Sequence, residues 1–182
     1  MEKSKFYKKY LPSIVYGGSD GAVSYFTLMA GAYGAGLSIR MLIAIGVSNI
    51  FADAFSMATA DYLSEDSRKT DLSLSKTTKI FTFSPATKSG VVTFFSFLTV
   101  GFFPLAPSIY AYFTVDPSGQ LPFDIFIISI AFTILAFIYI GFMRGAVLGR
   151  NRLHTIAQSL IICSISAIVA YYLGEWVAGL LR

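Results

Sequence analysis

Acidic, amide and sulfur-bearing side chains recur at a fixed spacing along one apolar stretch of the chain. Asn49, Asp53, Met57 and Asp61 follow one another every four residues, which in a helix places them on one slowly rotating stripe. An earlier apolar stretch carries one charged residue, Asp20. A carboxylate inside a hydrocarbon layer costs roughly 2.5 to 3.5 kcal/mol, and it usually faces a cavity, a partner or an ion path. These side chains are therefore the candidates for chemistry.

The donor set suits a divalent transition metal. Carboxylates bind and neutralise M²⁺, while the thioether of Met57 favours softer ions over Mg²⁺ and Ca²⁺. At about 1.5 Å per residue, Asp20 and Met57 both lie roughly 10 Å from the predicted inner ends of their helices, so we expect them to meet. Asp53 is expected one turn deeper and Asp61 near the inner mouth, so these groups are predicted to line one track. The same carboxylates can take up protons as metal leaves.

Each of these residues also has a structural interpretation. Asp20 precedes Gly21 and can mark a break in a glycine-rich helix, Asp53 can hydrogen-bond across a dimer interface, and Asp61 can be an ordinary helix-end charge. Met57 alone can simply fill a gap in the packing.

The stretches that carry these residues are long enough to cross a membrane. Of the 182 residues 55% are hydrophobic and 13% charged, whereas soluble domains carry about 25% charged residues. Spanning a bilayer takes about 20 mostly apolar residues. Windows of that kind predict an all-α integral membrane protein, with one transmembrane domain over 1–182, helices at about 13–37, 41–63, 88–114, 123–145 and 154–177, and a short loop at 64–87. The net charge of +4 comes from residues between apolar runs, which argues against nucleic-acid binding.

The basic residues predict the orientation of these helices, because Lys and Arg near membrane ends stay in the cytoplasm. With the N-terminus inside, twelve of the fourteen basic residues are cytoplasmic, and only Arg40 and Arg182 lie outside. The connection between the third and fourth helices holds no basic residue. We therefore predict a cytoplasmic N-terminus, a cytoplasmic loop at 64–87 and an external C-terminus.

Small residues form a second stripe beside the polar one. It consists of Ala44, Ser48, Ala52, Ser56 and Ala60. Small residues let helices approach closely, and the first helix offers a close-packing surface at Gly17 and Gly21. The short turn around 38–40 makes the first two helices antiparallel neighbours.

Two motifs resemble the vacuolar iron transporter family. The first is the Gly-Gly-Ser-Asp-Gly core within Tyr16 to Ala35, and the second, more specific one is N-I-F-A-D-A-F-S-M-A-T-A-D-Y-L-S at Asn49 to Ser64. Phe103 to Pro107 and Gly141 to Gly145 extend the similarity over nearly the whole chain. The resemblance implies a five-helix homodimer, joined through its first and second helices, which exports Fe²⁺, and often Mn²⁺, from the cytosol in exchange for protons. The family's metal-site Asp and Met then fall on Asp20 and Met57.

The chain departs from the family pattern in its cytoplasmic parts. Better-known members carry a long Glu-rich metal-binding domain between the second and third helices, whereas Leu63 to Lys88 has only Glu65, Asp66 and Asp71. Members also commonly bear acidic residues on the cytoplasmic extension of the first helix, where this chain has Lys9 and Ser13. We therefore expect no cytosolic metal capture by a separate domain.

The expected partners are the transported metal, the lipid bilayer and a second copy of the chain. Metal and protons are cargo, so we expect neither a bound cofactor nor enzymatic activity. The expected location is the plasma membrane in a prokaryote, and the vacuole or another endomembrane in a eukaryote. A non-transporting dimeric membrane scaffold and a channel for another small cation are the alternatives. A scaffold has no need for Asp20 and Met57 at matching depth.

Overall fold

The computed structural model describes residues 2–70, 84–149 and 151–181. These residues form five α-helices, as predicted: α1 (Glu2–Gly34), α2 (Ile39–Thr70), α3 (Pro85–Thr114), α4 (Phe123–Leu148) and α5 (Arg152–Leu180). Within the described ranges, α2 to α5 are long and apolar enough to cross a membrane, and the chain is an integral membrane protein. The polar and small residues of Gly17 to Gly21 lower the hydropathy of α1, so its crossing stays a prediction.

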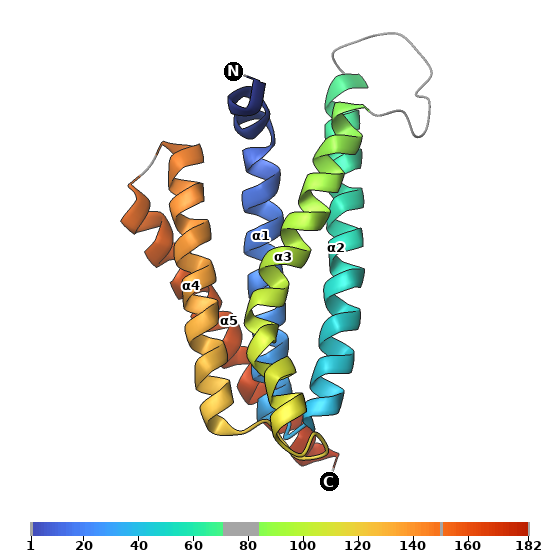
Figure 1. Ribbon diagram of the computed structural model, residues 1–182, viewed down its shortest axis with the longest axis vertical. Helices are drawn as coiled ribbons and strands as arrows, with labels where there is room; N and C mark the ends of the chain where they lie inside the picture. The colour runs from blue at the N-terminus through green and yellow to red at the C-terminus, as the bar shows by residue number, and fades with distance from the viewer. Residues whose placement is uncertain (1, 71–83, 150, 182) are drawn as a thin grey trace.

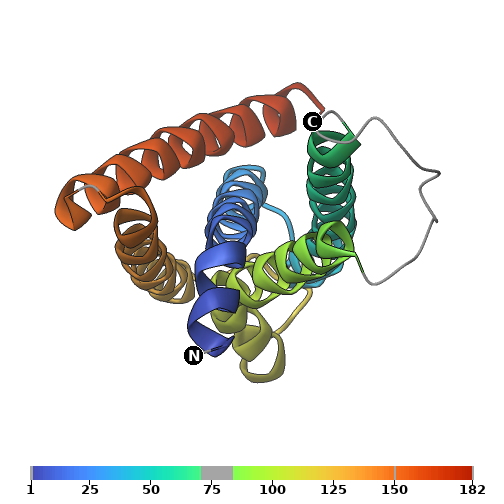
Figure 2. The ribbon, with the colours of Figure 1, turned by 90° about the horizontal axis from the view of Figure 1, so that it is seen from above.

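Helix α1 lies at the centre of the bundle and contacts each of the other four helices (Figure 2). Helix α2 lies at the edge, where it packs against α1 and α3 and, over the described residues, does not reach α4 or α5. The start of α1, the end of α2 with the start of α3, and the end of α4 with the start of α5 lie at one end of the bundle (Figure 1). We call this the N-terminal end, and the opposite end, which holds the C-terminus, the C-terminal end.

All five helices extend beyond their predicted bounds at one end or both, and α1 and α2 extend furthest. Helix α1 begins at Glu2 and includes Pro12. Helix α2 continues past position 63 to Thr70, and in this extension Glu65 and Arg68 form an ion pair of 3.8 Å, a pairing that suits a helix. The predicted loop at 64–87 is therefore partly helical, and its middle, 71–83, lies outside the described residues.

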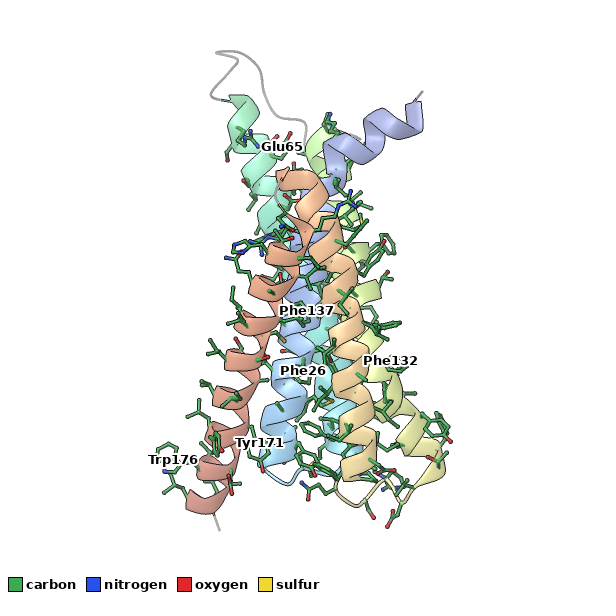
Figure 3. The ribbon with its side chains drawn as sticks, turned by 90° about the vertical axis from the view of Figure 1, so that its left-hand side faces the viewer. Phe26, Glu65, Phe132, Phe137, Tyr171 and Trp176 are labelled. Atoms are coloured by element: carbon green, nitrogen blue, oxygen red, sulfur yellow. The ribbon has the colours of Figure 1, made fainter. Side chains whose placement is uncertain are left out.

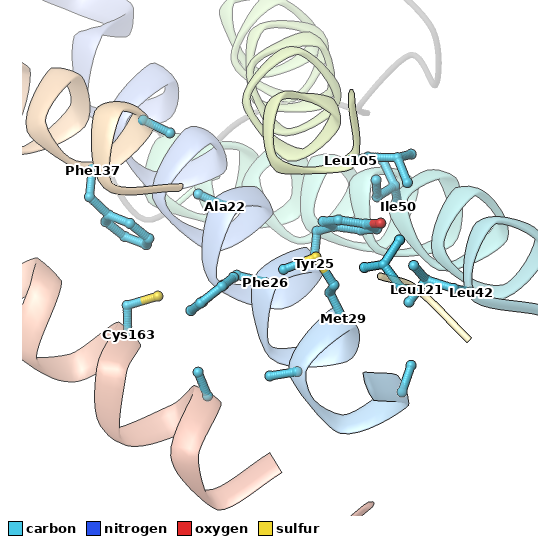
Figure 4. Close-up of a cluster of buried hydrophobic side chains, with 14 of the residues drawn as sticks. Ala22, Tyr25, Phe26, Met29, Leu42, Ile50, Leu105, Leu121, Phe137 and Cys163 are labelled. Atoms are coloured by element: carbon cyan, nitrogen blue, oxygen red, sulfur yellow. The ribbon is translucent and has the colours of Figure 1, made fainter. Parts of the chain in front are cut away.

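The apolar core lies on two sides of α1 (Figure 4). Tyr25 and Met29 lie on the side of Ile50 and Leu105, whereas Phe26 lies on the side of Phe137, and all six side chains are buried. Large apolar side chains also cover the outside of the bundle. Trp176 is 63% exposed and points away from the other helices (Figure 3). Such an outer surface suits lipid rather than water.

The glycine surface of α1, predicted to allow close packing, packs against α3. A Cβ added at Gly17 would lie 2.6 Å from the carbonyl oxygen of Thr93, and one at Gly21 would lie 2.5 Å from that of Phe97. Helix α3 thus occupies the space that these glycines leave. Contact between α1 and α2 includes Gly46, whose missing side chain makes room for the ring of Tyr25.

Two chain connections are joined at the C-terminal end. The amide of Ile39 donates to the carbonyl oxygen of Gly119 at 2.9 Å, and the amide of Arg40 donates to that of Pro117 at 3.1 Å. The side-chain amide of Gln120 donates to the carbonyl oxygen of Tyr33 at 2.9 Å. We call this set of bonds the loop clasp. It fastens the α1–α2 turn to the α3–α4 connection.

The α1–α2 turn depends on one glycine. Gly36 has φ of +72°, a conformation that glycine adopts without a steric penalty. The next amide, that of Leu37, donates to the carbonyl oxygen of Ala32 at 3.0 Å and closes the end of α1. The chain therefore reverses within a few residues, and α2 begins beside the end of α1.

Candidate functional site

The polar stripe on α2 faces two different neighbours. An α-helix turns by about 100° per residue, so each step of four residues overshoots a full turn by about 40°. Asn49, Asp53, Met57 and Asp61 are all half-buried, but the drift carries Asp61 about 80° away from Asp53. The carboxylates of Asp53 and Asp61 consequently face different parts of the bundle.

Asp53 and Asn49 line a cavity of about 670 Å³ between α1, α2 and α5. The cavity lies where α2 and α5 do not touch. The side-chain amide of Asn49 donates to Oδ2 of Asp53 at 2.6 Å, which fixes the carboxylate within the wall of this space. The cavity wall is otherwise mostly apolar, and among the described residues that line it Asp53 is the only acidic one.

Asp20 lies on α1, close enough to Asp53 for the two carboxylates to repel each other. Its side chain is half-buried, and over the described residues no hydrogen bond or ion pair satisfies its carboxylate. Two neighbouring carboxylates inside an apolar bundle need a compensating positive charge. A metal ion or protons would supply it.

Met57 is half-buried and packs against the buried apolar cluster shown in Figure 4. This contact agrees with the structural interpretation of Met57, in which its side chain fills a gap in the packing. A meeting of its sulfur with Asp20 remains a prediction.

Asp61 faces α3 instead of the cavity. Its Oδ2 accepts hydrogen bonds from the hydroxyl of Ser89 at 2.8 Å and from that of Thr93 at 2.5 Å. Both donors are buried, at 7% and 0% exposure. In the structure Asp61 therefore joins α2 to α3 by hydrogen bonds, whereas the metal-ligand role predicted for it stays a prediction.

No group of three or more His, Cys, Asp or Glu side chains is placed to hold a metal ion within the described ranges. The structure brings Asp20, Asp53 and Asn49 near one another. Asp61 points elsewhere, and Asp71 lies outside the described residues. One copy of the chain thus offers a pair of carboxylates rather than a complete coordination shell.

Two hydroxyl residues that sequence reasoning missed line the same cavity. Ser24 and Thr27 lie on the cavity wall, and Oγ1 of Thr27 is buried with no hydrogen-bond partner among the described residues. Their spacing from Asp20, at four and seven residues, is the one-face pattern of a helix. That pattern was the available signal, and it places two hydroxyl oxygens on the cavity wall together with Asp53.

Comparison with known proteins places the chain in a family. The model of the VIT family matches residues 11–79 and 71–175, which is most of the chain. The chain belongs to the VIT family. The motif at Gly141 to Gly145 marks a helix crossing in this member: a Cβ at Gly145 would lie 2.9 Å from Cα of Arg152. Thr155 donates to the carbonyl oxygen of Gly141 at 2.9 Å.

Three relatives show where similarity to this VIT family member is concentrated. A vacuolar iron transporter of Toxoplasma gondii is 40% identical over 60 residues, covering 33% of this chain and 20% of the relative. Vacuolar iron transporters of Plasmodium berghei and Plasmodium falciparum are 39% identical over 57 residues and 34% identical over 62 residues. These cover 31% and 34% of this chain, and 21% and 23% of the respective relatives. The matched region thus spans about a fifth of the relatives' length.

Proposed function

We propose that the protein is a secondary transporter, which moves Fe²⁺, and also Mn²⁺, out of the cytosol in exchange for protons. The observation that carries this proposal is the carboxylate of Asp20, which has no partner among the described residues and lies close enough to Asp53 for the two charges to repel, together with the open cavity that Asp53 lines between α1, α2 and α5. Membership of the VIT family and relatives named as vacuolar iron transporters support the metal. No enzymatic step or bound cofactor is needed.

The exchange follows from the charge on these two carboxylates. M²⁺ neutralises the negative charges of Asp20 and Asp53 when it binds, and protons neutralise them when the metal has left. The carboxylates are therefore never left uncompensated in the membrane. Met57 is proposed to add a sulfur ligand that selects soft ions. Asn49 of α2 and Ser24 and Thr27 of α1 line the cavity, which is the proposed path of the ion.

The proposed functional unit is a homodimer joined through α1 and α2. The stripe of small residues on α2 is exposed in one copy, and this stripe comprises Ala44, Ser48, Ala52, Ser56 and Ala60. An exposed small-residue stripe lets a second helix approach closely. A second copy would also bring further carboxylates to a site that is incomplete in one chain.

The location follows the mechanism. In a eukaryotic cell we propose the vacuole or another endomembrane, into which cytosolic metal would be moved. In a prokaryotic cell the plasma membrane would serve the same purpose. Within either membrane, the N-terminus is proposed to face the cytosol.

Metal flux into proteoliposomes under a proton gradient tests the proposal. Asp20→Asn keeps the size of the side chain but removes its charge, so Fe²⁺ and Mn²⁺ flux should fall to background while the protein stays folded. Asp124→Asn is the matched control, because Asp124 is an exposed carboxylate in the first turn of α4. This control should keep the wild-type flux. Full activity in Asp20→Asn would refute the site and favour the scaffold interpretation.

A further inference from the structure

A chain of polar contacts joins three helices near the N-terminal end of the bundle. Asp61 on α2 accepts hydrogen bonds from Ser89 at 2.8 Å and from Thr93 at 2.5 Å, both on α3. The hydroxyl of Ser89 also lies 2.8 Å from that of Ser13 on α1. All three hydroxyl residues are buried. We call these four residues the Asp61 junction.

The carboxylate oxygen of Asp61 gives the junction a direction. It can only accept, and each hydroxyl has one proton to donate. Ser89 and Thr93 therefore both donate to Oδ2 of Asp61, and Ser13 must donate to Ser89. Asp61 is thus the final acceptor that orients hydroxyl groups from two other helices.

Thr93 lies close to both neighbouring helices. Its hydroxyl bonds to α2, while its carbonyl oxygen would lie 2.6 Å from a Cβ at Gly17 of α1. One turn earlier on α3, Gly90 approaches the carbonyl oxygen of Ala58 on α2, 2.7 Å from an added Cβ. The backbones are therefore in near contact on both sides of α3. A hydrogen bond at such a point fixes the rotation of one helix on the next.

We propose that Asp61 is a positioning residue, which acts as a hydrogen-bond acceptor for α3 and does not bind the transported metal. By fixing the rotation of α2, it would set the direction in which Met57 and Asp53 face, one and two turns earlier on the same helix. This inference rests on the proposed transport function. It differs from a ligand role in a measurable way, since it needs an acceptor oxygen at position 61 and not a charge.

The pair Asp61→Asn and Asp61→Leu separates the two roles. The side-chain carbonyl oxygen of Asn can accept both hydroxyl bonds, so Asp61→Asn should keep metal flux within about threefold of the wild type. Asp61→Leu leaves two buried hydroxyl groups without their acceptor and should lower the flux about tenfold or more. Loss of transport in a folded Asp61→Asn protein, equal to that in Asp61→Leu, would overturn the proposal.

Substitutions of Thr93 test the junction from α3. Thr93→Val keeps the shape and removes the donor, whereas Thr93→Ser keeps the donor. We expect Thr93→Val to reduce flux and Thr93→Ser to restore it. Equal activity of the two variants would contradict a role for this hydroxyl.

A thermal melting cycle in detergent does not depend on transport. Thr93→Val should lower the melting temperature of the wild-type background and have little further effect on Asp61→Leu, because the shared bond is already gone. Additive shifts would overturn the junction. Absence of Fe²⁺ and Mn²⁺ flux in the wild type would instead reject the transport function, and the melting cycle would still decide the role of Asp61.

Discussion

The acidic residues inside the bundle differ in how their charge is satisfied. Asp61 accepts two hydroxyl groups from α3, and Asp53 accepts the amide of Asn49. Asp20 accepts no hydrogen bond over the described residues and lies beside Asp53. A buried charge without a partner is expensive unless an ion or proton joins it. Transport chemistry is therefore expected to be most sensitive to Asp20.

Met57→Leu tests whether sulfur matters. The two side chains are similar in volume, and the exchange should cost under about 1.5 kcal/mol of stability. We expect a folded protein whose preference for Fe²⁺ over Mg²⁺ and Ca²⁺ weakens, because only oxygen ligands remain. Competition between these ions in a liposome flux assay measures the preference. An unchanged preference would leave Met57 with its packing role alone.

The sequence was sufficient to find the candidate residues but not all of their neighbours. Spacing identified the stripe on α2 and the isolated Asp20. Spacing also gives the drift of about 80° between Asp53 and Asp61. It could not show that Asp53 consequently faces the cavity and Asp61 faces α3. The neighbour of Asp61 is decided by the packing of α3, which contributes Ser89 and Thr93 from far along the chain.

At the scale of the helices, α3 is the element that holds α1 and α2 together near the N-terminal end. Its backbone lies against Gly17 and Gly21 of α1, and Gly90 lets it approach α2. Small residues at such crossings permit van der Waals contact between backbones, which drives association in lipid. A side chain added at one of these positions has to push two helices apart.

Gly21→Ala should therefore destabilise the protein. The new Cβ would lie 2.5 Å from the carbonyl oxygen of Phe97, and overpacking of this kind costs about 1 to 3 kcal/mol. Gly179→Ala on α5 is the matched control, since nothing lies within 4 Å of its added Cβ. The control should be neutral or slightly stabilising, because alanine favours a helix by about 1 kcal/mol over glycine. Thermal melting in detergent compares the two, and equal melting temperatures would contradict the close crossing.

The exposed stripe on α2 leads to a prediction about assembly. Ala52→Leu adds bulk where the second copy is proposed to pack, so the dimer fraction in detergent should fall. Ala157→Leu makes the same change on an exposed position of α5 and should leave the dimer intact. Size-exclusion chromatography with light scattering measures both. A dimer that survives Ala52→Leu would move the interface to another face.

At the scale of the whole molecule, the connections alternate between two ends. Arg68 and Lys88 flank the α2–α3 connection, and Arg152 follows the α4–α5 connection, all at the N-terminal end, whereas Arg40 lies at the C-terminal end (Figure 1). This distribution is the one that the positive-inside rule associates with a cytoplasmic N-terminal end. The orientation itself is a prediction.

Reporter fusions test that orientation. A reporter after Arg182 should be found outside the cytosol, and one inserted near Lys76 should be found inside, because α3, α4 and α5 would separate them by an odd number of crossings. Accessibility to a membrane-impermeant label in intact cells distinguishes the two sides. Both reporters on one side would exclude five spans.

The number and type of helices were predictable because apolar runs of about 20 residues admit few alternatives in a membrane. The arrangement of those helices was harder. The short turn indicated that α1 and α2 are neighbours, yet Gly17 and Gly21 pack on α3. Glycine leaves room for a helix without specifying which helix takes it, so the partner depends on the complete bundle.

The loop clasp has a consequence for how the chain is made. During synthesis, the amides of Ile39 and Arg40 leave the ribosome well before Gly119 and Pro117, the residues whose carbonyl oxygens accept their hydrogen bonds. Until α3 has been inserted, the α1–α2 turn must find its hydrogen bonds in water, which keeps it out of the hydrocarbon layer. A nascent chain that ends before Pro117 therefore contains the α1–α2 hairpin but lacks the carbonyl groups of Pro117 and Gly119 that accept hydrogen bonds from its turn. We therefore expect biogenesis in two stages, with the hairpin formed first and the clasp closed after the third helix has crossed.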